Sequence, residues 1–229
     1  MNKPHNTPAA LLAAALLLLA PAFARAQTYI ETTDAGATLA TAYTITGGGS
    51  LTTISGTLSD AYDVDLFKIV IASPTLFSAT TIGSSTPWDL DTQLYLFDST
   101  GHAVFGNDDA DYTTLQSTIS ASSISHLTSG IYYLAISQSG NDPVNSVSQL
   151  LFTGYGADST AALTASTLAN PTTLSDWTNG TYFADSGSYQ IALTGVTAVP
   201  EVATTASALG ACALAAGMWL RRRRTAIAA

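Results

Sequence analysis

Carboxylates gather around one predicted β-hairpin. Its two strand candidates, 92–98 and 102–106, are joined by a short turn at 99–101. Such a turn brings the free ends of its strands together, and oxygen-bearing side chains flank both of these ends. They are Asp89, Asp91, Asn107, Asp108, Asp109 and Asp111. Because Ca²⁺ takes roughly six to eight oxygen ligands in proteins, the pattern predicts a calcium site here. The alternative is a set of turn-forming residues exposed to water.

A second, weaker calcium candidate consists of Asp60, Asp63 and Asp65. Alternate residues of a strand share one face. We therefore expect Asp63 and Asp65 to mark one outward face at the start of the strand candidate 64–71.

Catalytic chemistry finds little support in the residue types. A pair such as Asp91 and Asp109 could serve a glycosidase, but nothing in the sequence indicates an apolar pocket that would raise one pKa. The only histidines between 27 and 201 are His102 and His126, and no nucleophile-elbow motif is present there. Two scattered histidines and no cysteine also disfavour zinc. We predict no catalytic residues and keep a small secreted hydrolase as an alternative.

Two tryptophans, Trp88 and Trp177, could stack on carbohydrate. The alternative is that they are core residues, since aromatic side chains that alternate along strands usually pack inside. A carbohydrate- or protein-binding module with a defined ligand therefore remains a competing prediction.

The N-terminus is typical of a secretory signal. A basic start is followed by an Ala/Leu stretch at 9–20, and Ala24-Arg25-Ala26 offers small residues at the cleavage positions. We predict a signal peptide over 1–26 and an ectodomain over 27–198.

The C-terminus contains three elements in order. Val199-Pro200-Glu201 precedes a charge-free stretch at 202–220, which is long enough to cross a bilayer as a helix. The basic cluster Arg221, Arg222, Arg223 and Arg224 follows and should stay on the cytoplasmic side. The alternative to a sorting signal is an ordinary single-span anchor.

This segment, 199–224, resembles the PEP-CTERM sorting signal of Gram-negative bacteria, although residue 202 is Val where the family has a second proline. The resemblance implies an exosortase-type processing enzyme as a partner. It also implies transient anchoring in the inner membrane, followed by release to the cell surface or extracellular matrix.

The charge of the ectodomain is strongly one-sided. All sixteen acidic residues of the chain lie between 27 and 201, whereas Lys68 is the only lysine or arginine of the 27–198 ectodomain. Such a surface repels nucleic acid, so we predict no nucleic-acid partner. The lone cysteine, Cys212, lies in the predicted span, which excludes disulfides from the ectodomain.

Short apolar stretches with period two predict an all-β fold, an antiparallel, jelly-roll-like β-sandwich. The strand candidates are 51–58, 64–71, 75–82, 92–98, 102–106, 115–119, 131–136 and 188–194. Candidate 131–136 should be buried on both faces. We expect 27–49 to be a loose arm with one edge strand, and 154–187 to be a partly ordered excursion.

Four motifs in order resemble the bacterial pre-peptidase C-terminal (PPC) domain over about 58–153. They are Asp63-Val64-Asp65-Leu66-Phe67, 91–101, Asn107-Asp108-Asp109 and 129–136. The resemblance implies a non-catalytic module, some of whose relatives bind collagen-like polymers, polysaccharide or calcium. We expect an exported structural or adhesive protein, with extracellular polysaccharide as a partner and Ca²⁺ as its one candidate cofactor.

Overall fold

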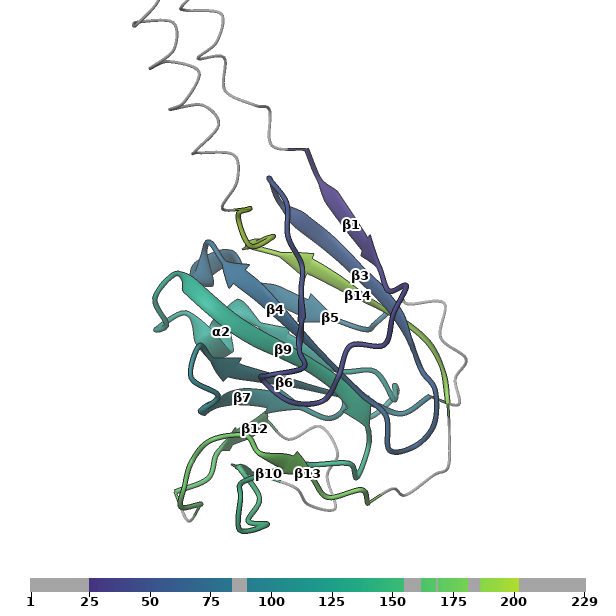
Figure 1. Ribbon diagram of the computed structural model, residues 1–229, viewed down its shortest axis with the longest axis vertical. Helices are drawn as coiled ribbons and strands as arrows, with labels where there is room; N and C mark the ends of the chain where they lie inside the picture. The colour runs from purple at the N-terminus through teal and green to yellow at the C-terminus, as the bar shows by residue number, and fades with distance from the viewer. Residues whose placement is uncertain (1–24, 84–89, 155–161, 168, 181–185, 202–229) are drawn as a thin grey trace, which may run out of the picture.

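The computed structural model describes residues 25–83, 90–154, 162–167, 169–180 and 186–201. These residues form an all-β protein built on two large sheets (Figure 1). No helix in these five stretches is long and hydrophobic enough to traverse a bilayer. Most of the predicted signal peptide, the predicted span and the arginine cluster lie outside the described residues.

The smaller sheet has five strands in the order β1-β3-β14-β5-β8. Its β1–β3 pair is parallel and its other pairs are antiparallel. The bounds are β1 Gln27–Ile30, β3 Leu51–Leu58, β14 Gly187–Thr194, β5 Ser78–Thr80 and β8 Thr118–Ser120.

The larger sheet has eight strands, in the order β11-β12-β7-β6-β9-β4-β15 with β2 also paired to β4. The bounds are β2 Tyr43–Thr44, β4 Val64–Ile71, β6 Thr92–Asp98, β7 Ala103–Asn107, β9 Gly130–Gln138, β11 Phe152–Thr153, β12 Ala162–Ala165 and β15 Val196–Thr197. A separate ribbon pairs β10 Pro143–Val144 with β13 Asp176–Trp177, and the described helices are η1 Pro74–Leu76 and α2 Ala121–Ile124.

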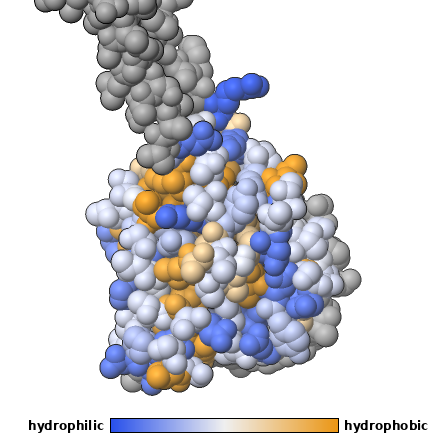
Figure 2. Space-filling view, viewed as in Figure 1, coloured by the Kyte–Doolittle hydropathy of each residue, from blue (hydrophilic) through white to orange (hydrophobic). Residues whose placement is uncertain are grey.

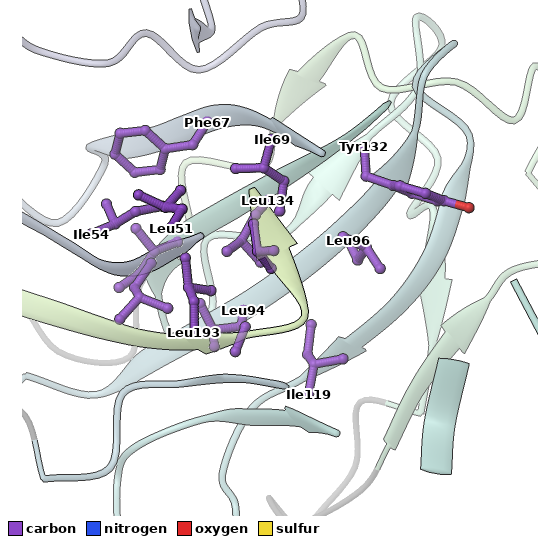
Figure 3. Close-up of a cluster of buried hydrophobic side chains, with 14 of the residues drawn as sticks. Leu51, Ile54, Phe67, Ile69, Leu94, Leu96, Ile119, Tyr132, Leu134 and Leu193 are labelled. Carbon is purple, nitrogen blue, oxygen red and sulfur yellow. The ribbon is translucent and has the colours of Figure 1, made fainter. Parts of the chain in front are cut away.

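The main core lies between the two sheets. Leu51, Ile54 and Leu193 of the smaller sheet meet Phe67 and Leu134 of the larger one (Figure 3). Burial of these alternating side chains removes apolar surface from water and makes the sheets pack face to face.

The outer face of the larger sheet carries a second apolar cluster. Tyr95 and Phe97 of β6 pack there with Phe152 and Trp177. The central strands β4, β6 and β9 are therefore covered on both faces, as their near-continuous apolar character predicts. This confirms the expectation for 131–136 apart from Ile131, which is 39% exposed.

Several strand candidates match the structure closely. Candidates 51–58, 64–71 and 92–98 have the bounds of β3, β4 and β6. Candidate 75–82 is instead split between η1 and the short β5, because Pro74 starts a 3₁₀ turn that delays the strand.

The segment 27–49 is more than a loose arm. It contributes β1 to the smaller sheet and β2 to the larger one, so it bridges the two. The rings of Tyr29 and Tyr43 lie 4.7 Å apart between centroids, and Tyr29 also contacts Phe67. These aromatic contacts hold the segment against the main core.

The first and last residues of the described chain lie side by side. Gln27 Nε2 donates to Thr46 O at 3.3 Å, and Gly47 N donates to Val199 O at 3.1 Å. We call this side the terminal end of the sandwich; it lies at the top of Figure 1. At the opposite end β4 and β6 begin and β7 and β9 finish, as their pairing registers require.

Large exposed hydrophobic side chains are scattered over the described surface. On the face drawn in Figure 2, hydrophilic and near-neutral residues surround separate small apolar areas. Isolated apolar side chains of this kind are normal for a folded protein.

Candidate metal centre

The β6–β7 hairpin forms as the sequence predicts. Its antiparallel register places Leu94 opposite Asn107. The turn closes where Gly101 N donates to Asp98 O at 3.0 Å, and Gly101 takes a φ of 89° that side chains other than hydrogen disfavour. This hairpin brings the residues before β6 and after β7 to the end of the sandwich that lies opposite the terminal end.

Three of the predicted ligands meet there: Asp91, Asp108 and Asp109, which we call the hairpin-end cluster. Carboxylate oxygens, one from each residue, lie within 4.8 Å of one another. Asp91 is 8% exposed and Asp109 5% exposed, so their charges are largely shielded from water. Ser139, the residue after β9, lies on the other side and donates from its backbone N to Asp91 O at 2.9 Å.

Burial and neighbouring charge raise the pKa of Asp108 in this cluster. Burial, and then the charge of Asp109, raise the pKa of Asp108 to about 6, although hydrogen bonds from Ser139 and Gln93 oppose the shift. Asp108 Oδ1 is buried without a hydrogen-bond partner among the described residues. The cluster therefore favours an added positive charge, either a proton or a cation.

Two further predicted ligands, Asn107 and Asp111, have hydrogen bonds of their own. Asn107 Oδ1 accepts from Thr118 N at 2.6 Å, and Asn107 Nδ2 donates to Asp109 O at 3.0 Å. Asp111 is exposed and accepts from Thr113 N at 2.7 Å. Hydrogen bonds from Thr113 lower the pKa of Asp111 and explain its place in a turn. Asp89 lies outside the described residues.

A second group of acids, the cross-sheet cluster, consists of Glu31, Asp34 and Asp65. Their carboxylate oxygens also lie within 4.8 Å of one another. Glu31 directly follows β1 of the smaller sheet, whereas Asp65 belongs to β4 of the larger one. This cluster therefore spans the gap between the sheets, near the same end as the hairpin-end cluster.

The prediction that Asp65 points outward is wrong. Asp65 is 0% exposed and shares the inward face of β4 with Phe67 and Ile69. Strand β4 is buried on both faces, so alternation alone could not identify a solvent side. Asp60 and Asp63 instead organise the loop before β4, where they accept from Tyr62 N at 2.8 Å and Ser59 N at 2.6 Å.

Burial dominates the electrostatics of the cross-sheet cluster. It raises the pKa of Asp65 to about 8, and the charges of Glu31 and Asp63 add to the shift while the Tyr189 hydrogen bond opposes it. Burial and the charge of Asp63 also raise the pKa of Asp34. Asp65 Oδ1 is buried without a hydrogen-bond partner among the described residues.

Local backbone contacts hold Glu31 in place. Its Oε1 accepts from Ala35 N at 2.9 Å, and its Oε2 accepts from Thr57 N at 3.1 Å. A Cβ added at Gly56 would lie 2.4 Å from both Glu31 Oε2 and the Tyr189 hydroxyl oxygen. A glycine is therefore needed for these two groups to approach β3.

Sequence reasoning missed Glu31, Asp34 and Tyr189 as parts of a site. One signal was available, because Glu31 and Asp34 are the only charged residues between 27 and 59. Their pairing with Asp65 depends on the path of the chain between the sheets, which periodicity does not reveal.

Both clusters offer the same chemistry. Each supplies three carboxylates and neither supplies histidine or cysteine. Oxygen-only donors suit hard cations such as Ca²⁺, whereas structural zinc is usually held by nitrogen and sulfur. The buried, partnerless oxygens Asp65 Oδ1 and Asp108 Oδ1 fit such an ion.

The predicted ligand-binding tryptophan Trp177 is 4% exposed and belongs to the second apolar cluster. Its Nε1 donates to Ala37 O at 2.8 Å, and its ring meets Tyr95 at a centroid distance of 5.7 Å. The ring is thus occupied by protein packing. Trp88 lies outside the described residues.

The described part of the predicted sorting signal, Val199, Pro200 and Glu201, lies at the terminal end. Val199 N donates to Ile45 O at 2.7 Å, which attaches the start of the motif to the sandwich. Arg221, Arg222, Arg223 and Arg224 lie outside the described residues.

No family model matches the chain, and no curated protein matches it significantly.

Proposed function

We propose that the chain is an exported, non-catalytic protein with a structural or adhesive role at the cell surface or in the extracellular matrix. A signal peptide directs export. The PEP-CTERM-like tail holds the chain transiently in the inner membrane, where an exosortase-type enzyme processes it.

The position of Gln27 and Val199 at one end of the sandwich carries this proposal. Gln27 and Val199 both bond to the 45–47 segment. A segment that entered the membrane after Glu201 would therefore leave the whole sandwich on one side of the bilayer. The acidic clusters, at the far end, would face away from anionic headgroups, which minimises charge repulsion.

The cofactor of this proposal is Ca²⁺. In the cross-sheet cluster, Glu31, Asp34 and Asp65 would hold the ion and thereby join β1 to β4. In the hairpin-end cluster, Asp91, Asp108 and Asp109 would hold it. The ion would neutralise carboxylates that otherwise repel one another in a buried setting, and so would stiffen the exposed end of the domain.

The finer fold assignment, a jelly-roll-like sandwich of the PPC type, belongs to the same proposal. The hairpin at 92–107, the buried β9 and the acidic residues that flank them support it. A non-catalytic role is favoured because Asp91 and Asp109 are buried close together, which suits an ion better than the cleft that a polymer substrate requires.

Cell fractionation with mass spectrometry of both termini tests the export route. We expect the chain in the envelope or medium, with Gln27 as its first residue. Replacing Arg221–Arg224 by serine should leave N-terminal cleavage intact and abolish normal retention or processing, whereas the control Lys68→Ser should change neither. Recovery of the intact chain, signal peptide included, from the cytosol would refute the proposal.

A further inference from the structure

The five strands of the smaller sheet differ in charge from the rest of the ectodomain. None of these described strands contains Asp, Glu, Lys, Arg or His, although the chain carries a net charge of −9. The larger sheet, in contrast, includes Asp65, Lys68 and Asp98 within its strands. The strands of this sheet therefore present no charged side chain that could pair with a charged group of a partner.

Its outward face is covered with hydroxyl groups in register. One row crosses all five strands as Thr28, Thr53, Ala192, Thr80 and Thr118. Strands lie about 4.8 Å apart, so four steps give a row about 19 Å long.

The neighbouring rows are similar. Ser55 pairs with Gln190 in one of them, and Thr57 pairs with Ser188 in the next. None of these side chains is buried. We call this surface, made of the row above with Ser55, Thr57, Ser188 and Gln190, the hydroxyl face.

Most of the hydroxyl face keeps its hydrogen-bonding capacity. Thr80 and Thr118 bond to each other at 2.6 Å. The side chains of Thr28, Thr53, Ser55, Thr57 and Ser188 make no hydrogen bond to the rest of the described chain. Each hydroxyl can donate one hydrogen bond and accept two, so the face can bind a partner rich in hydroxyl groups.

We infer that the hydroxyl face is a docking surface for an uncharged, extended polysaccharide. Three observations select this partner: the face has no charged side chain, its exposed hydroxyl groups are open donors and acceptors, and its rows are long enough to follow a polymer. A second copy of the chain is a poorer occupant, because two strongly acidic domains repel each other. The inference rests on the proposed extracellular role and deepens it.

Retention of the purified full chain on microcrystalline cellulose, insoluble starch and agarose tests the inference, with carboxymethylcellulose as the anionic comparator. We expect retention on at least one neutral polymer, undiminished at high salt. Ala192→Glu and Ala192→Lys should each weaken it by about tenfold or more, which corresponds to at least about 1.4 kcal/mol. Because the two variants carry opposite charges, a common loss excludes simple charge attraction.

Two further variants complete the design. Thr28→Val/Thr53→Val removes hydroxyl groups while it keeps shape and strand preference, and it should weaken retention without lowering Tm. Thr164→Glu, an exposed threonine of β12 in the other sheet, is the matched control and should bind like the wild type.

Three results would overturn the inference: no retention on any neutral polymer, equal loss in Thr164→Glu, or a dimer in analytical ultracentrifugation that Ala192→Glu dissociates. These results concern the purified chain and leave the export route untouched. A cytosolic chain that still bound neutral polymer would refute the proposed function alone.

Discussion

The hydroxyl of Tyr189 on β14 donates a 2.6 Å hydrogen bond to Asp65 Oδ2 on β4. The two residues belong to different sheets, and the bond lies in the interior where both are buried. A buried carboxyl and a buried hydroxyl therefore link the two halves of the sandwich at the end that carries the acidic clusters.

Replacing Tyr189 with Phe tests the contribution of this link. The change leaves Asp65 with one fewer donor and keeps the ring, so we expect a loss of about 1–3 kcal/mol in the free energy of unfolding. Urea denaturation measures it. Tyr112→Phe, at a residue that is 77% exposed, should change stability by less than about 0.5 kcal/mol. Equal losses of stability in Tyr189→Phe and Tyr112→Phe would show that the Tyr189–Asp65 hydrogen bond does not stabilise the sandwich.

Stability without metal should fall as the pH rises. The pKa of Asp65 is raised from 3.8 to about 8, so the folded chain holds this proton more tightly than the unfolded chain does. The contribution is fully present below about pH 4 and is lost as the pH passes through about 8. Asp108, whose pKa is raised to about 6, changes stability in the same direction over a lower pH range, between about 4 and 6.

Unfolding in EDTA at a series of pH values measures this dependence. Asp65→Asn should remove the decline between about pH 7 and pH 8, because Asp108, with a pKa of about 6, has lost most of its proton there. A decline of undiminished slope in Asp65→Asn would assign the effect to another group.

Calcium should raise the Tm of the wild-type chain, and EDTA should lower it. At a calcium concentration 100 times Kd, the expected stabilisation is about 2.7 kcal/mol for one site. Asp108→Asn should remove the calcium stabilisation that comes from the hairpin-end cluster. Asp111→Asn should not change this stabilisation, because Asp111 lies outside the cluster. A wild-type Tm that changes with neither calcium nor EDTA would exclude a stabilising calcium site.

Gly56→Ala should disturb the cross-sheet cluster. The added methyl group would meet Glu31 Oε2 and the Tyr189 hydroxyl at 2.4 Å, so one of them must move. We expect a loss of about 1–3 kcal/mol, as is typical of overpacking, and a weaker calcium response. Gly48→Ala is the control, since nothing lies within 4 Å of its added methyl group. Calorimetry that finds the two variants equally stable would refute this requirement for glycine.

The strands near the middle of the chain were readable from sequence. Candidates 64–71 and 92–98 show the β-branched and aromatic content of central strands, and the turn at 99–101 identified the hairpin. Local pattern and turn chemistry act over a few residues, so they predicted Asp91, Asp108 and Asp109 as neighbours.

The contacts between the sheets were not readable in this way. Asp65 was placed on the wrong side because both faces of β4 are buried, which removes the polar–apolar contrast that alternation needs. Whether Trp177 binds carbohydrate or packs in the core could not be predicted for a similar reason, since its role depends on what the 141–180 segment covers.

The all-β class, the acidic charge of residues 27–201 and the hairpin that gathers one set of carboxylates could be predicted from the sequence, because they depend on composition and on neighbours along the chain. The contact of Glu31 with Asp65 and the shared row of Thr28, Thr53, Thr80 and Thr118 emerge only in the folded structure. Those neighbours come from distant parts of the chain, and long-range packing and strand order place them together.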